Sequence, residues 1–415
     1  MSREPTRGRH PRRGAALLVA LVLALAMAGL CTALLAVNLS TGRSRVQDQG
    51  GQRSFYAAEA GLSDAFMQLT EGQLKVKAGE TGWVGTPQEP VALGSSAYWV
   101  EVQPQGSRGF LLASTGLDGE DDVRLGLLLG KAPTGFFQWA AFGSDGVVLD
   151  SNSFIDSYDS ALGTWESQVK GGNDFAKENG HVGSNGDILL KSNTEIHGDA
   201  RPGPGHILDD SAPGIYISGS TEPLEEPFPM PEITVPSATS KGKLVGATSL
   251  TLGPGTIRYD SILMQGGTKL TIKGPAQVIT ADFTMKSNTE LAFDTSEGKV
   301  ELYSSRNFVL ESNSKVTTSS VSAVDVTLLL SGNNISKKPA DVLQLGANAD
   351  FVGAIYAPHA KFKLASNFNI YGSIMCQRLD LSSFGQIHFD EALLYDGWGA
   401  TDELEPRLWQ RLPRQ

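Results

Sequence analysis

An uncharged apolar stretch near the N-terminus constrains this chain more than any other feature. Residues 15–37 carry no charge, and a run of about 23 residues can cross the roughly 30 Å hydrocarbon core of a bilayer as a helix. The preceding residues 1–14 hold five arginines against one glutamate. Because a positively charged flank stays in the cytoplasm, the body is expected on the other side. We predict a single-pass membrane protein whose body is exported across the membrane.

Composition narrows the class of the exported body. The 415 residues include 47 glycines and 20 prolines, and 40% of them are apolar. Turn residues between short apolar runs favour many short strands over long helices, so we expect a mainly β body. A net charge of −11 gives no electrostatic basis for nucleic-acid binding. The two cysteines, Cys31 and Cys376, are not expected to form a disulfide because the first lies in the apolar stretch.

The junction between the basic leader and the apolar stretch contains the run Arg12-Arg13-Gly14-Ala15. It resembles the cleavage site of type IV prepilins, where a prepilin peptidase cuts after the glycine and leaves the helix on the mature protein. The resemblance implies cleavage between Gly14 and Ala15. It also implies a single-pass protein of the bacterial inner membrane, with its body in the periplasm or on the cell surface. Most pilins have glutamate at the fifth mature position, which is Val19 here, so the resemblance indicates a minor subunit.

Two other interpretations of the N-terminus stay open. A secretory signal would use the small residues up to Ala26 or Ala28 for cleavage, although the apolar stretch continues beyond both. An uncleaved signal anchor would have the same hydrophobicity as a processed pilin.

A second family motif follows the apolar stretch, in the run Arg53-Ser54-Phe55-Tyr56-Ala57-Ala58-Glu59-Ala60-Gly61-Leu62. It resembles the "FYAAEAGL" segment of PilX-like type IV pilus assembly proteins. Apolar residues recur here at helical spacing, which predicts one helical face. The candidate assembly face comprises Phe55, Ala58, Glu59, Leu62, Phe66 and Leu69. The alternative is that this face packs on the protein's own body, with Glu59 solvated instead of paired with a partner's cation.

The glycines before this motif are expected to interrupt the helix. Gly42, Gly50 and Gly51 each weaken a helix by about 1 kcal/mol relative to alanine. We therefore expect a kink or break there. Beyond the helix, residues 98–102, 110–115 and 123–129 alternate with turn residues and predict a small antiparallel meander. A helix packed on such a sheet is the general pilin arrangement.

From about residue 136 a short unit recurs, consisting of a small residue, Asn, two variable residues and an apolar residue. Copies start at Ser192, Ala347 and Ser366, with weaker copies at Ser151, Ser287 and Ser312. Phe351, Ile370 and Ile387 lie 19 and 17 residues apart, a plausible length for one coil, so we predict a β-helix with these residues and Ile196 pointing inward. Asn suits left-handed turn positions, and a turn role is favoured over a ladder of ligands.

A proline-rich stretch at 221–239 cannot join a sheet interior and is expected to be an excursion between coils. Residues 350–390 resemble the C-terminal repeat domain often joined to PilX-like N-termini.

No catalytic constellation is evident in the sequence. Asp156 and Asp159 lie three residues apart, but no carboxylate pair repeats from coil to coil as a polysaccharide-active or Ca²⁺-binding face would require. The five histidines beyond the leader have no short metal spacing and no Cys or Glu placed to complete a site; they are His181, His197, His206, His359 and His388. We expect no enzyme activity, no metal and no cofactor.

The predicted organisation has five parts. A leader spans 1–14, the N-terminal helix 15–75, the meander 76–135, the β-helix 136–396 and a tail 397–415. The resemblance implies a minor pilin or pilus assembly component whose partners are other pilins, pilus assembly proteins, the prepilin peptidase and the inner membrane. Its destination would be a pilus, a type II secretion pseudopilus or the membrane itself. The alternatives are a membrane-anchored adhesin whose solenoid binds glycans or other cells, and a polysaccharide-active enzyme.

Overall fold

The computed structural model describes residues 27, 30–33, 35, 49–77, 79–106, 108–311, 313–332, 342–345, 350–364 and 366–413. The chain forms two compact units, Met1–Lys131 with Leu404–Gln415, and Ala132–Glu403. We call them the helix–sheet unit and the parallel unit. The predicted leader 1–14 and most of the predicted span 15–37 lie outside the described residues. Within the described part of the chain, no helix combines the length and apolar character needed to cross a membrane.

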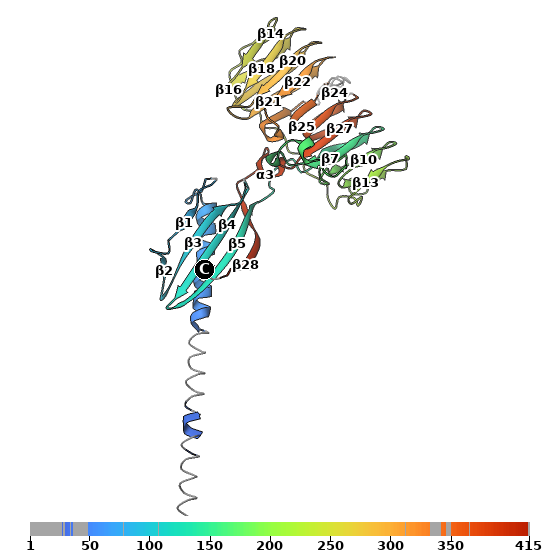
Figure 1. The fold of residues 1–415 in the computed structure, drawn as a ribbon. Coiled ribbons are helices and arrows are strands. Elements are labelled where there is room, and N and C mark those ends of the chain that lie inside the picture. Colours follow the sequence, from blue (N-terminus) through green and yellow to red (C-terminus); the bar gives the residue numbers. More distant parts are fainter. Residues whose placement is uncertain are drawn as a thin grey trace, which may run out of the picture. The chain divides into compact units, whose positions relative to one another are not determined.

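The helix–sheet unit is an antiparallel sheet with one helix against it (Figure 1). Its strands are β1 Gly82–Val84, β2 Val91–Leu93, β3 Ser96–Pro104, β4 Gly109–Asp118, β5 Asp121–Lys131 and β28 Leu404–Arg411. They pair in the order β1-β3-β4-β5-β28, with β2 paired on β3. The three-strand meander is confirmed as β3, β4 and β5, each longer than the sequence pattern indicates. The predicted tail contributes β28, which pairs antiparallel with β5.

The helix runs continuously over residues 49–70 in the described part of the chain. The predicted break at Gly50 and Gly51 is therefore wrong, while Gly42 lies outside the described residues. Gly50 is buried, and a β-carbon there would collide with the Asp121 carboxylate. The absence of a side chain at Gly50 thus allows the helix to lie close to the turn between β4 and β5. The helix ends where Gly72 adopts φ of +69° and the Gln73 N–H bonds to the Gln68 carbonyl, an arrangement typical of helix C-termini.

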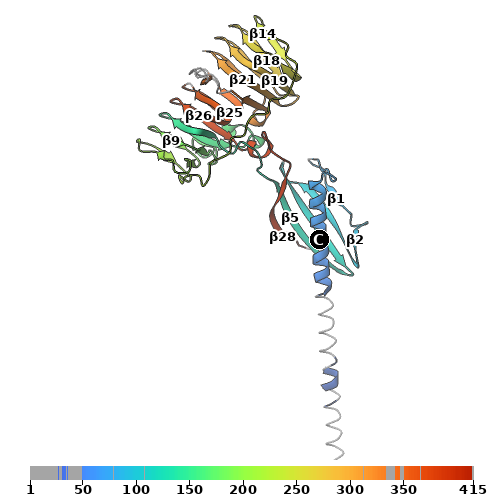
Figure 2. The same cartoon turned by 180° about the vertical axis from the view of Figure 1, so that it is seen from behind.

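The parallel unit is a long, solenoid-like stack of short strands (Figures 1 and 2). One large sheet contains β6 Ala141–Leu149, β7 Phe154–Tyr158, β8 Val182–Ser184, β9 Asp187–Leu190, β10 Glu195–Ile196, β11 Ala200–Arg201, β12 Leu208–Asp209, β13 Tyr216–Ile217, β14 Lys243–Gly246, β16 Gly255–Arg258, β17 Ser261–Met264, β19 Ala276–Met285, β21 Val300–Leu310, β23 Val326–Leu330, β24 Val342–Leu345, β25 Asp350–Leu364, β26 Asn369–Leu381 and β27 Gln386–Asp390. A second sheet contains β15 Leu250–Leu252, β18 Lys269–Lys273, β20 Glu290–Asp294 and β22 Lys315–Thr318. Its short helices are η1 Ser160–Leu162, α2 Trp165–Gln168, η2 Ala323–Asp325 and α3 Leu393–Asp396. The strand pairings in both sheets are parallel.

An apolar column runs through the stack, as the repeat spacing predicts. Phe351 pairs with Ile370, which pairs with Ile387, so the intervals of 19 and 17 residues are coil lengths. Ile387 in turn pairs with Ile155, and Ile155 with Ile196. Each of these five side chains is at most 1% exposed. Their inward orientation is confirmed, and each coil depends on its neighbours to bury its apolar residue.

The order of the coils in space differs from their order in the chain. β6 and β7 pair with β26 and β27, so the first strands of the unit lie beside nearly the last, and β27 lies next to β7 in Figure 1. From β7 the chain continues through β10 to β13, and it resumes at β14 at the opposite end of the stack.

The proline-rich stretch 221–239 connects these two ends. It contains no strand, in agreement with prediction, and contacts the stack along its path. The Leu224 N–H bonds to the Pro202 carbonyl, and Asn185 exchanges two hydrogen bonds with the Phe228 backbone. Farther on, His359 Nε2 lies 2.8 Å from Glu232 Oε1.

Asparagines occupy left-handed turn positions, which confirms the turn role expected of them. Asn152, Asn193, Asn288 and Asn367 have φ between 56° and 61°. Asn pays less for this conformation than most residues because its short side chain bonds locally.

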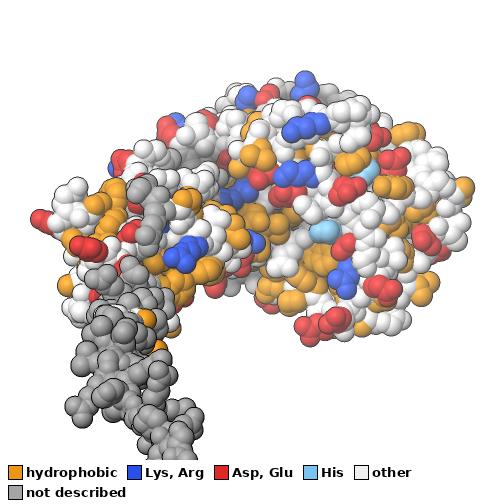
Figure 3. Space-filling model, turned by 60° about the horizontal axis from the view of Figure 1, so that its bottom comes forward, with side chains coloured by type: hydrophobic (Ala, Val, Ile, Leu, Met, Phe, Trp, Pro, Cys, Tyr) orange, Lys and Arg blue, Asp and Glu red, His pale blue; other side chains and the backbone are white. Residues whose placement is uncertain are grey.

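Opposite charges pair between neighbouring coils. Lys269 Nζ lies 2.8 Å from Glu290 Oε1, and Lys286 Nζ lies 2.6 Å from Glu311 Oε1. On the face that Figure 3 shows, acidic and basic side chains are interspersed with apolar ones. Charges of both signs therefore stabilise contacts between coils, and they do not create a surface potential of one sign.

Candidate functional site

The motif helix uses one face to hold the antiparallel sheet. Ala58 and Ala65 are fully buried and Leu62 is 4% exposed, in one apolar cluster with residues of β3 and β5 such as Val100 and Leu125. Small residues allow this close approach, because a β-carbon on Gly116 of β4 would collide with the Ser54 carbonyl. The alanines that give the motif its helix propensity therefore also set the distance between helix and sheet.

Polar contacts fix the same interface. The Tyr98 hydroxyl of β3 donates to Asp64 Oδ2 at 2.8 Å, and Ser54 Oγ donates to the Asp121 carbonyl at 2.8 Å. Burial and the neighbouring Asp64 carboxylate raise the pKa of Tyr98 to about 12. Tyr98 thus remains a protonated donor at physiological pH. These bonds hold the helix in register with the sheet.

The outer face of the helix is open in this unit. Tyr56 is 64% exposed and Met67 53% exposed, and neither joins the buried cluster. Arg53 lies on the outside as well and reaches Asp118 at 3.7 Å. The face thus offers large apolar side chains next to a cation.

A groove lies between the helix and β28. It has a volume of about 410 Å³ and is lined by Glu59, Leu62, Ser63, Phe66, Leu127, Pro406 and Trp409. The Phe55 and Trp409 rings meet edge to face at 6.0 Å and connect the helix to β28. The walls are mostly apolar and Glu59 is the one carboxylate among them. The groove therefore suits an apolar side chain of a segment that also has a positively charged residue close by.

The predicted site residues divide between the core, the groove and the leader, which lies outside the described residues. Ala58 and Leu62 are buried in the core, which is the intramolecular packing that the sequence left open. Phe55, Phe66 and Leu69 pack on the edge of this core and are partly buried. Glu59 is half-buried and lines the groove. Gly14 and Ala15 lie outside the described residues.

The lining from β28 and β5 is absent from the predicted face. Pro406 and Trp409 belong to a segment that the sequence indicates to be a tail, and a proline within it hides the strand pattern. The strand predicted over residues 123–129 was the available signal for Leu127.

A second cluster in the parallel unit involves the two aspartates noted in the sequence. Asp156 Oδ1 lies 2.6 Å from His388 Nδ1, with both side chains fully buried. Asp156 Oδ2 accepts from Trp165 Nε1 at 2.6 Å and from the Ala176 N–H at 2.9 Å. Asp159 accepts from the Ala161 N–H and caps η1. Both aspartates thus hold the segment 159–181, which we call the cover segment.

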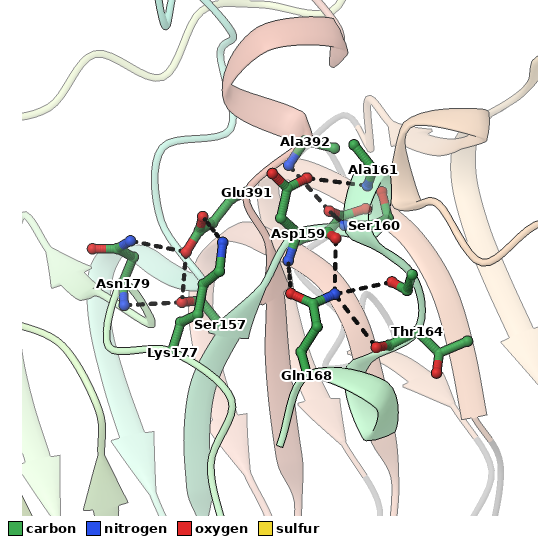
Figure 4. A network of polar contacts seen from close by, with 12 residues as sticks. Ser157, Asp159, Ser160, Ala161, Thr164, Gln168, Lys177, Asn179, Glu391 and Ala392 are labelled. Atoms are coloured by element: carbon green, nitrogen blue, oxygen red, sulfur yellow. Dashed lines mark hydrogen bonds and ion pairs between the residues drawn. The ribbon is translucent and has the colours of Figure 1, made fainter. Parts of the chain in front are cut away.

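The cover segment is fastened to the stack by further bonds (Figure 4). Glu391 accepts from Lys177 Nζ at 2.7 Å, from Asn179 Nδ2 at 2.8 Å and from Ser157 Oγ at 3.0 Å. Within the segment, Gln168 Nε2 donates to the carbonyl oxygens of Asp159 and Gly163. The cover segment is therefore held in a defined conformation by polar contacts within itself and with the stack.

Comparison with known proteins identifies one matching family model, described as a domain of unknown function (DUF7305), over residues 226–395. No curated protein matches the sequence. Among solved structures, the competence-associated pilin ComZ from Thermus thermophilus is similar at 10% identity and a TM-score of 0.29, covering 88% of this chain and 97% of that one. An ice-binding protein from the Antarctic ascomycete Antarctomyces psychrotrophicus is similar at 12% identity and a TM-score of 0.30, covering 63% of this chain and 98% of that one. The sequence identities and TM-scores of both structures are too low to support an inference about this chain.

Proposed function

We propose that this chain is a minor pilin-like component of a type IV pilus or related assembly, anchored in the inner membrane and acting by protein–protein contacts without catalysis. Its mature form begins at Ala15 after a prepilin peptidase cuts behind Gly14. The parallel unit, a β-helix, is carried on this helix toward the periplasm or the cell surface.

The helix over residues 49–70 carries the proposal. It contains the PilX-like motif, and it buries only the face that holds its own sheet. The opposite face presents Tyr56 and Met67. A helix that has one face fixed and exposes two large apolar side chains among polar ones on the other face is suited to pack against the helices of other pilins. The groove beside Glu59 adds a place for an apolar side chain of the neighbouring subunit.

The structure favours particular variants for the test. Phe55 and Leu62 are poor choices, because lysine at either position would disturb the unit's own packing. We choose Tyr56→Lys and Met67→Lys, which change exposed positions on the open face. Leu93→Lys is the matched control, since Leu93 is 44% exposed in the same unit but lies on β2.

The measurements are pilus number and co-purification of other pilins, after membrane accumulation of every variant has been verified. We expect the two helix variants to lose assembly and the Leu93 variant to keep it. Normal assembly by both helix variants would remove the proposed surface. If deletion of residues 136–396 alone abolished cell attachment while pili formed normally, the adhesin alternative would replace this proposal.

A further inference from the structure

We infer that Asp174, Glu195 and His197 bind a divalent transition-metal ion, represented by Zn²⁺, that ties the cover segment to the stack. One ligand atom from each side chain lies within 4.8 Å of the other two. Zinc holds such atoms at about 2.0–2.2 Å, so the ligand atoms of a tetrahedral site stand roughly 3.4 Å apart. Small side-chain rotations would close this difference.

The local backbone explains why two of these residues converge. Glu195 and Ile196 form β10, and the His197 N–H continues the pairing by bonding to the Ile155 carbonyl. Side chains alternate along an extended strand, so Ile196 enters the core while Glu195 and His197 share the outer face. Glu195 and His197 are two residues apart, a spacing that brings side chains together on a strand but is not among the short sequence spacings typical of metal sites.

His197 provides the observation that points to a ligand. His197 is only 4% exposed, yet neither nitrogen of its ring has a hydrogen-bond partner among the residues that the structure describes. Its nearest ionic neighbour is Glu195, whose Oε2 lies 3.8 Å from His197 Nε2, beyond hydrogen-bonding distance. A buried polar group without a partner is costly, and coordination to a metal would satisfy one nitrogen.

The cover segment brings the third group. Phe175 stacks on the His197 ring at 4.0 Å and an interplanar angle of 17°, which fixes the ring's orientation. The Ala176 N–H bond to Asp156 holds the same stretch of backbone. Asp174 is exposed and Glu195 partly exposed, so water has access to the remaining coordination positions.

The donor set identifies the class of ion. One imidazole nitrogen with two carboxylates suits Zn²⁺ and its neighbours among the transition metals, whereas Ca²⁺ and Mg²⁺ prefer all-oxygen sites. The ion would join residue 174 to residues 195 and 197, and so hold the cover segment on the coil below it.

The test is a Zn²⁺ titration of the untagged full-length protein, purified in mild detergent and stripped of metal, against a chromogenic competing chelator. We expect one Zn²⁺ per chain. Removing a residue that only hydrogen-bonds to a metal ligand costs about 10–100-fold in metal affinity. Removing a ligand itself should cost at least as much, so Asp174→Asn and His197→Asn should each weaken Zn²⁺ binding by more than about tenfold. Asp174 is exposed, and its variant keeps the fold even if the buried histidine variant does not.

His206→Asn is the matched control, because His206 pairs with Asp187 at 2.9 Å but belongs to no group of three candidate ligands in the described residues. It should bind Zn²⁺ as the wild type does. Bound metal should also slow proteolysis within residues 159–181 in the wild type and not in Asp174→Asn. The inference is overturned if wild-type binding is not stoichiometric, if Asp174→Asn binds like the wild type, or if Ca²⁺ protects the segment and Zn²⁺ does not.

Discussion

Phe384 occupies the left-handed turn position that Asn152 holds in the adjacent coil. Their φ angles are 61° and 59°, and the Phe384 N–H bonds to the carbonyl of Ser151. The register that follows each turn is the same, since Gln386 pairs with Phe154. One coil therefore places an aromatic residue where other coils use asparagine or, at Gly214 and Gly267, glycine.

Replacing this phenylalanine with asparagine should stabilise the stack. A left-handed conformation costs a residue other than glycine or asparagine roughly 1–2 kcal/mol, and Phe384 is 56% exposed, so little packing is lost. We expect Phe384→Asn to gain about 1 kcal/mol, measured as slower hydrogen exchange in β26 and β27 of the full-length protein. The reverse change, Asn193→Phe, should speed exchange in β10. Equal exchange in all three proteins would show that the turn carries no such cost.

Two buried serines at the helix–sheet interface should respond in opposite directions. Both are fully buried, but Ser54 Oγ donates to the Asp121 carbonyl, whereas Ser114 Oγ has no hydrogen-bond partner in the described residues. Removing a bonded hydroxyl costs about 1 kcal/mol, while removing an unsatisfied one relieves desolvation. We therefore expect hydrogen exchange in β4 to be faster in Ser54→Ala and unchanged or slower in Ser114→Ala. Destabilisation of similar size in both would indicate that packing, not hydrogen bonding, decides.

The sequence pattern predicts a coil well and the order of coils poorly. The spacing of Phe351, Ile370 and Ile387 reports coil length, because each coil repeats the same local turn. The contact between Ser373 Oγ and the Trp139 carbonyl joins residues 234 positions apart. No local periodicity encodes it, since the pairing depends on where the proline-rich stretch takes the chain. β28 was missed for a related reason, because its strand forms only against β5.

Functional positions show the same limit. The helix motif locates the helix and its apolar face, yet periodicity alone does not separate Leu62, which is buried, from Met67, which is exposed. The proximity of Glu195 and His197 follows from strand alternation once β10 is assigned. Asp174 reaches them through the cover segment, whose path is set by tertiary contacts.

Two glycines in the helix–sheet unit should also behave differently when replaced by alanine. A β-carbon on Gly51 would meet nothing within 4 Å, so Gly51→Ala should gain about 1 kcal/mol from helix propensity. A β-carbon on Gly116 would collide with the Ser54 carbonyl, and forced separation of this kind costs roughly 1–3 kcal/mol. Hydrogen exchange across residues 54–66 should slow in the first variant and speed in the second. The opposite order would contradict the close approach of helix and strand.

The inter-coil ion pairs predict how the parallel unit responds to acid. The hydrogen bond from Lys269 lowers the pKa of Glu290 below its ordinary 4.5, and Lys286 does the same for Glu311. A carboxyl with a lowered pKa in the folded state contributes stability above its unfolded pKa and loses that contribution as the pH falls through the folded value. Exchange in β20 and β21 should therefore stay constant, after correction for intrinsic rates, down to about pH 5 and accelerate below pH 4.5. The double variant Glu290→Gln/Glu311→Gln should show a shallower acceleration, because two of the responsible carboxyls are gone. Glu225→Gln, at an exposed position of the proline-rich stretch, is the control and should follow the wild type. If the double variant kept the full acid response, the stabilising carboxylates would have to lie elsewhere in the stack.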